Sequence, residues 1–277
     1  MNYEEAINVQ YGQKNLIKKI QEVLKNEGID TAEMIRDVLA PIEELHLLGS
    51  VATLDLARKV GLNEKMKVLD VGCGIGGPAR NLVLNFGCHV TGLDLSKEYC
   101  QAAELINEYV GLGEKIDILQ GNALQMPFSN EIFDIVFVQH VLMNISDKKR
   151  FLSQIFRVLR PNGRLVVYTI CAGTLSPIYY PVIWANNPDI NFLLSAVDLR
   201  ELICNCGFKE FSWEDYTMRV IEEIELQRVK PRPKQKRPIN LGLIVMDPSL
   251  KWKNMVLNLK EERIVVIQGI FERELVF

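Results

Sequence analysis

Four glycines follow an aspartate in the segment VLDVGCGIGG, residues 68–77. The apolar run 67–71 predicts a buried strand, and Gly77 followed by proline predicts the start of a helix. Glycines at 72, 74, 76 and 77 allow the backbone to approach a bound nucleoside closely. We interpret Cys73 as a small residue that fits this loop and not as a nucleophile. The segment predicts a nucleoside-binding turn between a strand and a helix.

Two acids near this loop bear on the ligand. Asp94, at the end of the next predicted strand (89–93), can hold both hydroxyls of a ribose. An NAD site would share that acid. Asp70 suits a cationic amino-acid tail better than a pyrophosphate, because a carboxylate repels phosphate charge. A dinucleotide-dependent oxidoreductase and a non-catalytic cofactor-binding protein are the alternatives.

His140 follows an apolar strand predicted at 134–138. Its ordinary pKa lies near neutrality, so it is the candidate catalytic base, or else it shapes the pocket. Tyr179 and Trp184 either form an aromatic wall around a cationic amine or pack under a long loop. We interpret His46 as a structural or lid residue and Tyr11 as a surface aromatic, with a lid role as its alternative.

Composition narrows the class of protein. The chain has 277 residues, a net charge of −3 and 48% hydrophobic residues, which favours a folded protein that does not bind nucleic acid. No apolar run reaches the roughly 18–20 residues that span a bilayer, so we expect no stable membrane insertion and a cytoplasmic location. The six cysteines are expected to be reduced, and the three histidines are not grouped as metal ligands, so no metal is expected. The basic, proline-rich segment 230–238 is interpreted as a solvated loop, with binding to acidic lipid or phosphate as its alternative.

Strands and helices are expected to alternate every 20–30 residues from residue 67 onward, which predicts βαβ units and a parallel sheet. Before them, helices are expected at 14–27, at 31–39 with Thr31 as N-cap and Pro41 beyond the end, and at 50–60. We therefore expect an N-terminal helical cap over residues 1–62 and a larger α/β core domain over residues 63–277. Two segments, 171–197 and 217–262, do not fit the alternation and are expected to be insertions that cover the acceptor.

The ordered motifs resemble the class I S-adenosylmethionine-dependent methyltransferases. VLDVGCGIGG matches their first motif, GLDLS (92–96) the acidic strand end and GNALQMPF (121–128) the adenine loop. FDIVFVQHVLMNI (133–145) and VLRPNGRLVVY (158–168) match the fourth and fifth strands. GGPAR (76–80) resembles a subgroup that acts on glycine, sarcosine or dimethylglycine, with relatives that act on tocopherols and sterols.

The resemblance implies an α/β fold of the Rossmann-like type, with a seven-stranded, mostly parallel sheet, helices on both faces and an N-terminal helical cap. It implies S-adenosylmethionine as cofactor, S-adenosylhomocysteine as product and a small-molecule acceptor. An amine nitrogen of the glycine type is the first expectation, and a quinol, tocopherol-like phenol or sterol is the alternative. We expect a monomer or a homodimer.

The resemblance also implies roles for individual residues. Asp70 would hold the cofactor's ammonium and Asp94 its ribose, and the remaining cofactor contacts would be Gly72, Cys73, Gly74, Gly76, Leu95, Asn122, Ala123 and Gln139. Asn122 stands where relatives usually carry aspartate, which keeps an acceptor oxygen but loses a charge. The expected acceptor contacts are His140, Asn144, Tyr179 and Trp184.

Overall fold

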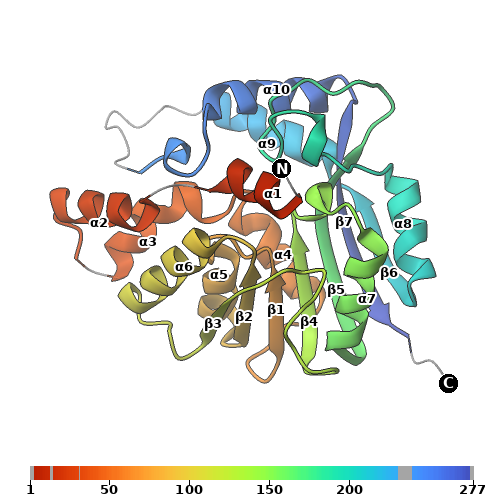
Figure 1. Ribbon diagram of the computed structural model, residues 1–277, viewed down its shortest axis with the longest axis horizontal. Coiled ribbons are helices and arrows are strands. Elements are labelled where there is room, and N and C mark those ends of the chain that lie inside the picture. The colour runs from red at the N-terminus through yellow and green to blue at the C-terminus, as the bar shows by residue number, and fades with distance from the viewer. Residues whose placement is uncertain (1–2, 13–14, 31, 230–238, 275–277) are drawn as a thin grey trace.

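A computed structural model describes residues 3–12, 15–30, 32–229 and 239–274. Its centre is one seven-stranded sheet in the order β3-β2-β1-β4-β5-β7-β6 (Figure 1). β7 runs antiparallel to both of its neighbours, and the other pairings are parallel. The predicted seven-stranded, mostly parallel sheet is therefore confirmed. The strands are β1 Lys67–Val71, β2 His89–Asp94, β3 Ile116–Gln120, β4 Phe133–Gln139, β5 Leu159–Ala172, β6 Phe208–Asp215 and β7 Ile264–Arg273.

Helices cover both faces of the sheet, as expected. Alternation along β4 directs Ile135 and Phe137 to one face and Val136 and Val138 to the other. The first face packs under α4 and α5, with α9 and α10 toward its far side, and the second packs under α7 and α8. The helices are α1 Tyr3–Tyr11, α2 Leu16–Asn26, α3 Ala32–Glu43, α4 Ser50–Lys59, α5 Gly77–Phe86, α6 Lys97–Tyr109, α7 Lys148–Val158, α8 Ala196–Asn205, α9 Thr217–Val229 and α10 Pro248–Lys260.

The first 62 residues divide between two packing units. Helices α2 and α3 form a separate apolar cluster with α6 and with residues 239–245. Helix α4 instead packs on α5 and belongs to the cover of the sheet. Helix α1 crosses the carboxyl ends of the strands (Figure 1). The N-terminal helices thus reach the end of the sheet where ligands of such folds bind.

Several local expectations need correction. Pro41 lies inside α3, which continues to Glu43, because a proline in the last turn forfeits only one hydrogen bond. Asp198 and Glu201 predict a capping-box-like start for a helix that ends at Gly207, but α8 begins after Ser195, whose hydroxyl accepts from the Asp198 N–H, so Ser195 is the N-cap. Helices α1 and α10 were not predicted. Thr31 and the basic segment 230–238 lie outside the described residues.

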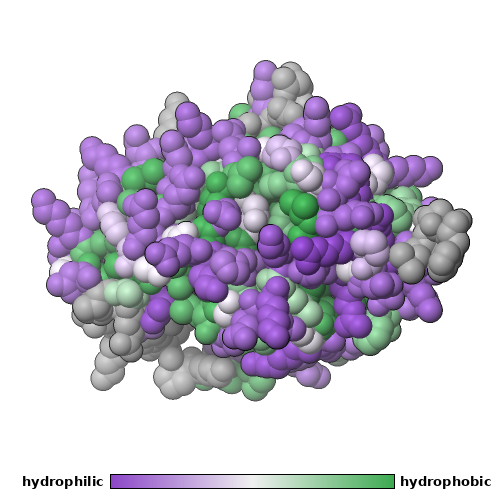
Figure 2. Space-filling view, turned by 90° about the horizontal axis from the view of Figure 1, so that it is seen from below, coloured by the Kyte–Doolittle hydropathy of each residue, from purple (hydrophilic) through white to green (hydrophobic). Residues whose placement is uncertain are grey.

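The amino ends of the strands face away from this region. Hydrophilic side chains cover most of that surface, with apolar ones interspersed (Figure 2). Among the described residues, no helix combines the length and apolar content that crossing a bilayer requires.

Candidate active site

A cavity of about 170 Å³ lies at the carboxyl ends of β1, β2, β3 and β4. Parallel strands place the residues that follow them at one edge, which is where the predicted site should be. Twelve predicted site residues line the cavity: Asp70, Gly72, Cys73, Gly74, Asp94, Leu95, Asn122, Ala123, Gln139, His140, Asn144 and Trp184. Gly76 and Tyr179 are not part of the lining.

The glycine loop is shaped by its backbone. The N–H of Gly72 donates to the Leu93 carbonyl at 2.7 Å, which ties the loop to β2. Gly72 has φ +73°, and a Cβ there would lie 2.4 Å from a methyl carbon of Val141. Gly76, at φ +82°, is the N-cap of α5. Gly72 and Gly76 thus adopt conformations that other residues rarely do.

Asp94 is fixed by the same loop. One of its carboxylate oxygens accepts from the Gly74 N–H at 2.9 Å and the other from the Ser96 N–H at 2.8 Å. Burial raises the pKa of this carboxyl, and the N–H donors oppose the rise. Each oxygen keeps a further lone pair, so the carboxylate can still accept hydrogen bonds from a diol.

Asp70 is the least satisfied acid of the site. It is 1% exposed, and its Oδ2 has no hydrogen-bond partner among the described residues. Burial raises the pKa of Asp70 to about 7, and the charges of Glu44 and Asp94 add to that effect while His46 opposes it. A buried acceptor without a donor is costly, so the geometry fits a ligand that brings a cation.

Three more unsatisfied polar atoms are found near Asp70, and the residues of two of them, Gln139 and His140, line the cavity. Gln139 Nε2, His140 Nε2 and the Tyr168 hydroxyl are buried without a partner among the described residues. The rings of His140 and Tyr168 lie 5.1 Å apart. Burial, and then the charge of His46, lowers the pKa of His140 well below its ordinary value, so its imidazole is neutral at pH 7. Gln139 and His140, which line the cavity, can orient a polar group of a second ligand.

Sequence reasoning missed Glu44 and underestimated His46. His46 Nε2 lies 2.9 Å from Glu44 Oε2, and both side chains are 4% exposed. Thr53 bridges the pair to β4, because its hydroxyl lies 2.8 Å from Glu44 Oε2 and 3.0 Å from Gln139 Oε1. The sequence signal was a glutamate two positions before a histidine in a short loop, EELHLLG.

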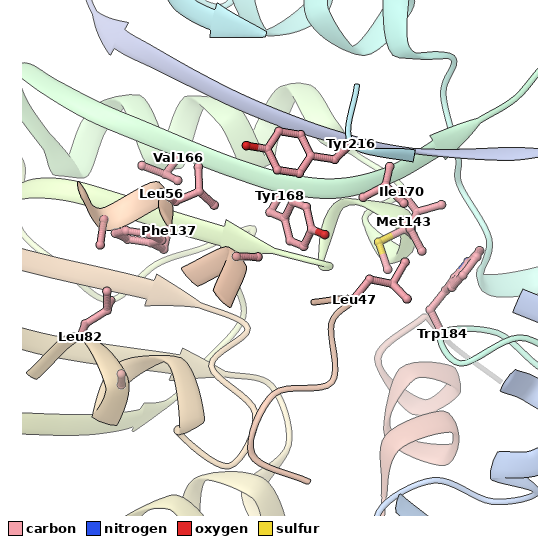
Figure 3. Packing of buried hydrophobic residues seen from close by; sticks show 14 of the residues in the cluster. Leu47, Leu56, Leu82, Phe137, Met143, Val166, Tyr168, Ile170, Trp184 and Tyr216 are labelled. Atoms are coloured by element: carbon pink, nitrogen blue, oxygen red, sulfur yellow. The ribbon is translucent and has the colours of Figure 1, made fainter. Parts of the chain in front are cut away.

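Tyr11 closes α1 over the cavity and is not a surface aromatic. Its hydroxyl donates to Asn144 Oδ1 at 2.8 Å. Asn144 in turn donates to the carbonyls of Trp184 and Ile190 at 3.0 and 2.9 Å. Asn144 therefore connects α1 to the segment 183–190. Leu47, Met143 and Trp184 gather beyond the strand ends, next to Tyr168 (Figure 3).

Tyr179 lies outside the cavity and does not form its aromatic wall with Trp184. Its hydroxyl bonds Glu261, and the Arg263 guanidinium stacks 4.3 Å from its ring. Trp184 is 1% exposed, and its indole N–H donates to Asn191. Within the described part of the chain, no three His, Cys, Asp or Glu side chains are grouped to hold a metal ion.

Comparisons with known proteins agree with this geometry. The family model described as a methyltransferase domain matches residues 69–167. Those residues are a methyltransferase domain. This confirms the resemblance drawn from the motifs, and the domain spans β1 to β5, which supply most of the strand ends around the cavity.

Relatives of the methyltransferase domain differ in what they act on. A sterol 24-C-methyltransferase of Gibberella zeae is 41% identical over 113 residues, which are 41% of this chain and 30% of that protein. A glycine/sarcosine/dimethylglycine N-methyltransferase of Actinopolyspora halophila is 32% identical over 126 residues, 46% of this chain and 22% of that protein. The chain therefore spans less than a third of the length of these two curated relatives.

A solved structure shares the fold over nearly the whole chain. It is a Haemonchus contortus phosphoethanolamine N-methyltransferase in complex with S-adenosylmethionine, with a TM-score of 0.72 and 18% identity. The match covers 99% of this chain and 60% of that one.

Proposed function

We propose that this chain transfers a methyl group from S-adenosylmethionine to a small-molecule acceptor. The observation that carries the proposal is the unpaired, buried Oδ2 of Asp70 inside the cavity, which a cofactor ammonium would satisfy. Asp94 would take the ribose hydroxyls, and Leu95, Asn122 and Ala123 would surround the adenine. The bound cofactor supplies an activated methyl on a sulfonium. The chain's own contribution is to align the acceptor with that methyl.

The lining of the cavity also bears on the acceptor. Among its described residues are the acids Glu43, Glu44, Asp70 and Asp94 but no lysine or arginine. A phosphate or a free carboxylate on the acceptor would meet these acids without a matching arginine or lysine. We therefore favour a neutral acceptor, such as a phenol, quinol or sterol, over the carboxylate-bearing amines expected first. A simple amine without a carboxylate also fits.

His140 is proposed to position the acceptor. A general base works best with a pKa near the operating pH, and burial takes the His140 pKa well below that range. Its unpaired Nε2 can accept a hydrogen bond from an acceptor hydroxyl, and Gln139 Nε2 can donate one.

The test is calorimetric titration with S-adenosylmethionine and, separately, with NAD. We expect binding of the first only, weakened more than tenfold in Asp94→Ala. Asp117→Ala is the matched control, because Asp117 lies on the neighbouring strand β3 outside the cavity. Binding of NAD alone, or equal affinity in Asp94→Ala, would refute the cofactor assignment.

Turnover is then measured with a labelled methyl donor and two pools of acceptors. One pool holds glycine, sarcosine, dimethylglycine and other small amines, and the other holds hydrophobic phenols, quinols and sterols. We expect label in the second pool. Label confined to the carboxylate-bearing amines would overturn the acceptor class but keep the methyltransferase. Label in neither pool, with the cofactor bound, would favour a non-catalytic binding protein.

A further inference from the structure

A second cavity of about 600 Å³ lies on the other side of the segment 43–48. Helices α3, α4, α5, α9 and α10 contribute to its lining. This cavity lies beside α9 and α10, which belong to the insertion 217–262 that the sequence predicts to cover the acceptor.

The two cavities share one wall. Six residues line both of them: Glu43, Glu44, Leu45, His46, Ile183 and Met255. The segment is held close to α5, because a Cβ at Gly77 would lie 2.0 Å from the Glu43 carbonyl oxygen. Arg80, on the same helix, bonds the Glu43 carboxylate at 2.8 Å. The segment 43–46, together with Ile183 and Met255, therefore borders both spaces.

The volumes indicate how two ligands could be divided between these spaces. Pockets for drug-sized ligands usually measure roughly 300–1,000 Å³. The first cavity, at about 170 Å³, is the smaller of the two and is already assigned to the cofactor, so an extended acceptor needs further space. The second cavity, at about 600 Å³, falls within the usual range.

The residues that line the second cavity indicate which kind of molecule it could bind. Apolar side chains come from α5, α9, α10 and the loop before α10, namely Leu84, Val220, Ile224, Leu241, Trp252 and Met255. The lining also includes the charged residues Arg36, Asp37 and Glu223, and the buried Arg80, which is paired with Glu43. The apolar side chains from α5, α9 and α10 can take an apolar body, which needs no charged partner.

We propose that the second cavity holds the apolar body of the acceptor, whose polar end passes Glu44 and His46 to reach Gln139 and His140. This inference rests on the proposed methyltransferase function and deepens it. It assigns the acceptor class as elongated, neutral molecules with a hydrocarbon portion. A small polar amine would leave the second cavity without a use.

The test is calorimetric titration of phenol, 4-butylphenol and 4-octylphenol into protein saturated with S-adenosylhomocysteine. Each buried methylene contributes about 0.8 kcal/mol, or roughly a fourfold gain in affinity. We expect 4-octylphenol to bind at least tenfold more tightly than 4-butylphenol. Ile224→Trp, which fills the second cavity, should remove that dependence on chain length.

Leu226→Trp is the matched control, because Leu226 lies on the same helix, is 54% exposed and does not line the cavity. If Ile224→Trp does not fold, Leu84→Trp replaces it, since Leu84 lines the cavity at its 45% exposed rim. An affinity independent of chain length in the wild type, or an equal loss in Leu226→Trp, would overturn the inference. Binding of S-adenosylhomocysteine is recorded first in every variant, so failure of the cofactor assignment is a separate result.

Discussion

Replacing Asp70 with asparagine should stabilise the empty protein and weaken cofactor binding at the same time. The substitution keeps the shape of the side chain but removes its charge. Burial raises the pKa of Asp70 from its ordinary value of 3.8 to about 7. At about 1.4 kcal/mol per pKa unit, that difference corresponds to roughly 4 kcal/mol of lost stability once the carboxyl is ionised.

Wild-type stability depends on pH because Asp70 ionises in different pH ranges in the unfolded and the folded protein. In the unfolded chain Asp70 loses its proton near pH 4, whereas in the folded protein it keeps the proton until about pH 7. The folded state therefore binds more protons between these values, and wild-type stability falls as the pH rises. Relative to Asp70→Asn, the wild type should lose stability from pH 4 to pH 7 and no further above it.

Urea unfolding of both proteins at pH 5, 6, 7 and 8 measures this difference. We expect the gap in unfolding free energy to widen up to pH 7 and then to level off. A gap that does not change with pH would show that Asp70 does not retain its proton in the empty site.

Cofactor binding should drive this proton off, because an ammonium beside Asp70 favours the carboxylate. With a pKa of about 7, Asp70 holds about 0.9 proton at pH 6 and about 0.1 at pH 8. Titration of S-adenosylmethionine in two buffers of different ionisation enthalpy measures the release. Nearly one proton should leave at pH 6 in the wild type and almost none in Asp70→Asn. Equal release in the two proteins would refute the proposed contact.

Three further changes test other parts of the molecule. Tyr11→Phe removes the hydroxyl that closes α1 over the cavity, so stopped-flow measurement should show S-adenosylhomocysteine leaving roughly threefold to tenfold faster; an unchanged rate would deny the lid role. Gly77→Ala should lower the unfolding free energy by about 1–3 kcal/mol, because its Cβ meets the Glu43 carbonyl, whereas Gly113→Ala in open space should not. His140→Gln should gain unfolding free energy relative to the wild type as the pH falls below about 6.5. Burial lowers the pKa of His140, so in that range the unfolded wild type takes up a proton that the folded wild type does not. Parallel curves of unfolding free energy against pH would contradict this.

The strands that frame the cavity were predictable because each leaves a local signal. Asp70 and Asp94 end apolar runs, and the glycines between them mark the turn. Such patterns depend on neighbours in the chain, and the five parallel strands β1 to β5 needed only the usual βαβ topology. The end of α3 was predicted too early, because a proline in the last turn of a helix, such as Pro41, has the same local pattern as one that follows a helix.

The cap side of the site was less predictable, because its residues meet across long sequence separations. Tyr11 bonds Asn144, and Thr53 bonds Gln139, through contacts that no local pattern encodes. Glu44 is a buried acid in a segment whose composition resembles an ordinary surface loop. The prediction for Tyr179 was wrong because closeness to Trp184 in the sequence does not fix where a side chain packs. The Tyr179 ring packs against Arg263 and not against the cavity.

The electrostatics of the cavity suggest how cofactor and product would be distinguished. Its described lining carries four acids, of which Glu43 is paired with Arg80, and no lysine or arginine, so the empty site favours cations once Asp70 is ionised. Methyl transfer removes the positive charge of the sulfonium but leaves the ammonium in place. The same carboxylates would then hold the product less strongly than the methyl donor. A neutral acceptor adds no charge to this balance, whereas an anionic one would cancel the attraction for the donor's cation. The preference for a neutral acceptor and the preference for the methyl donor over its product thus have one physical origin.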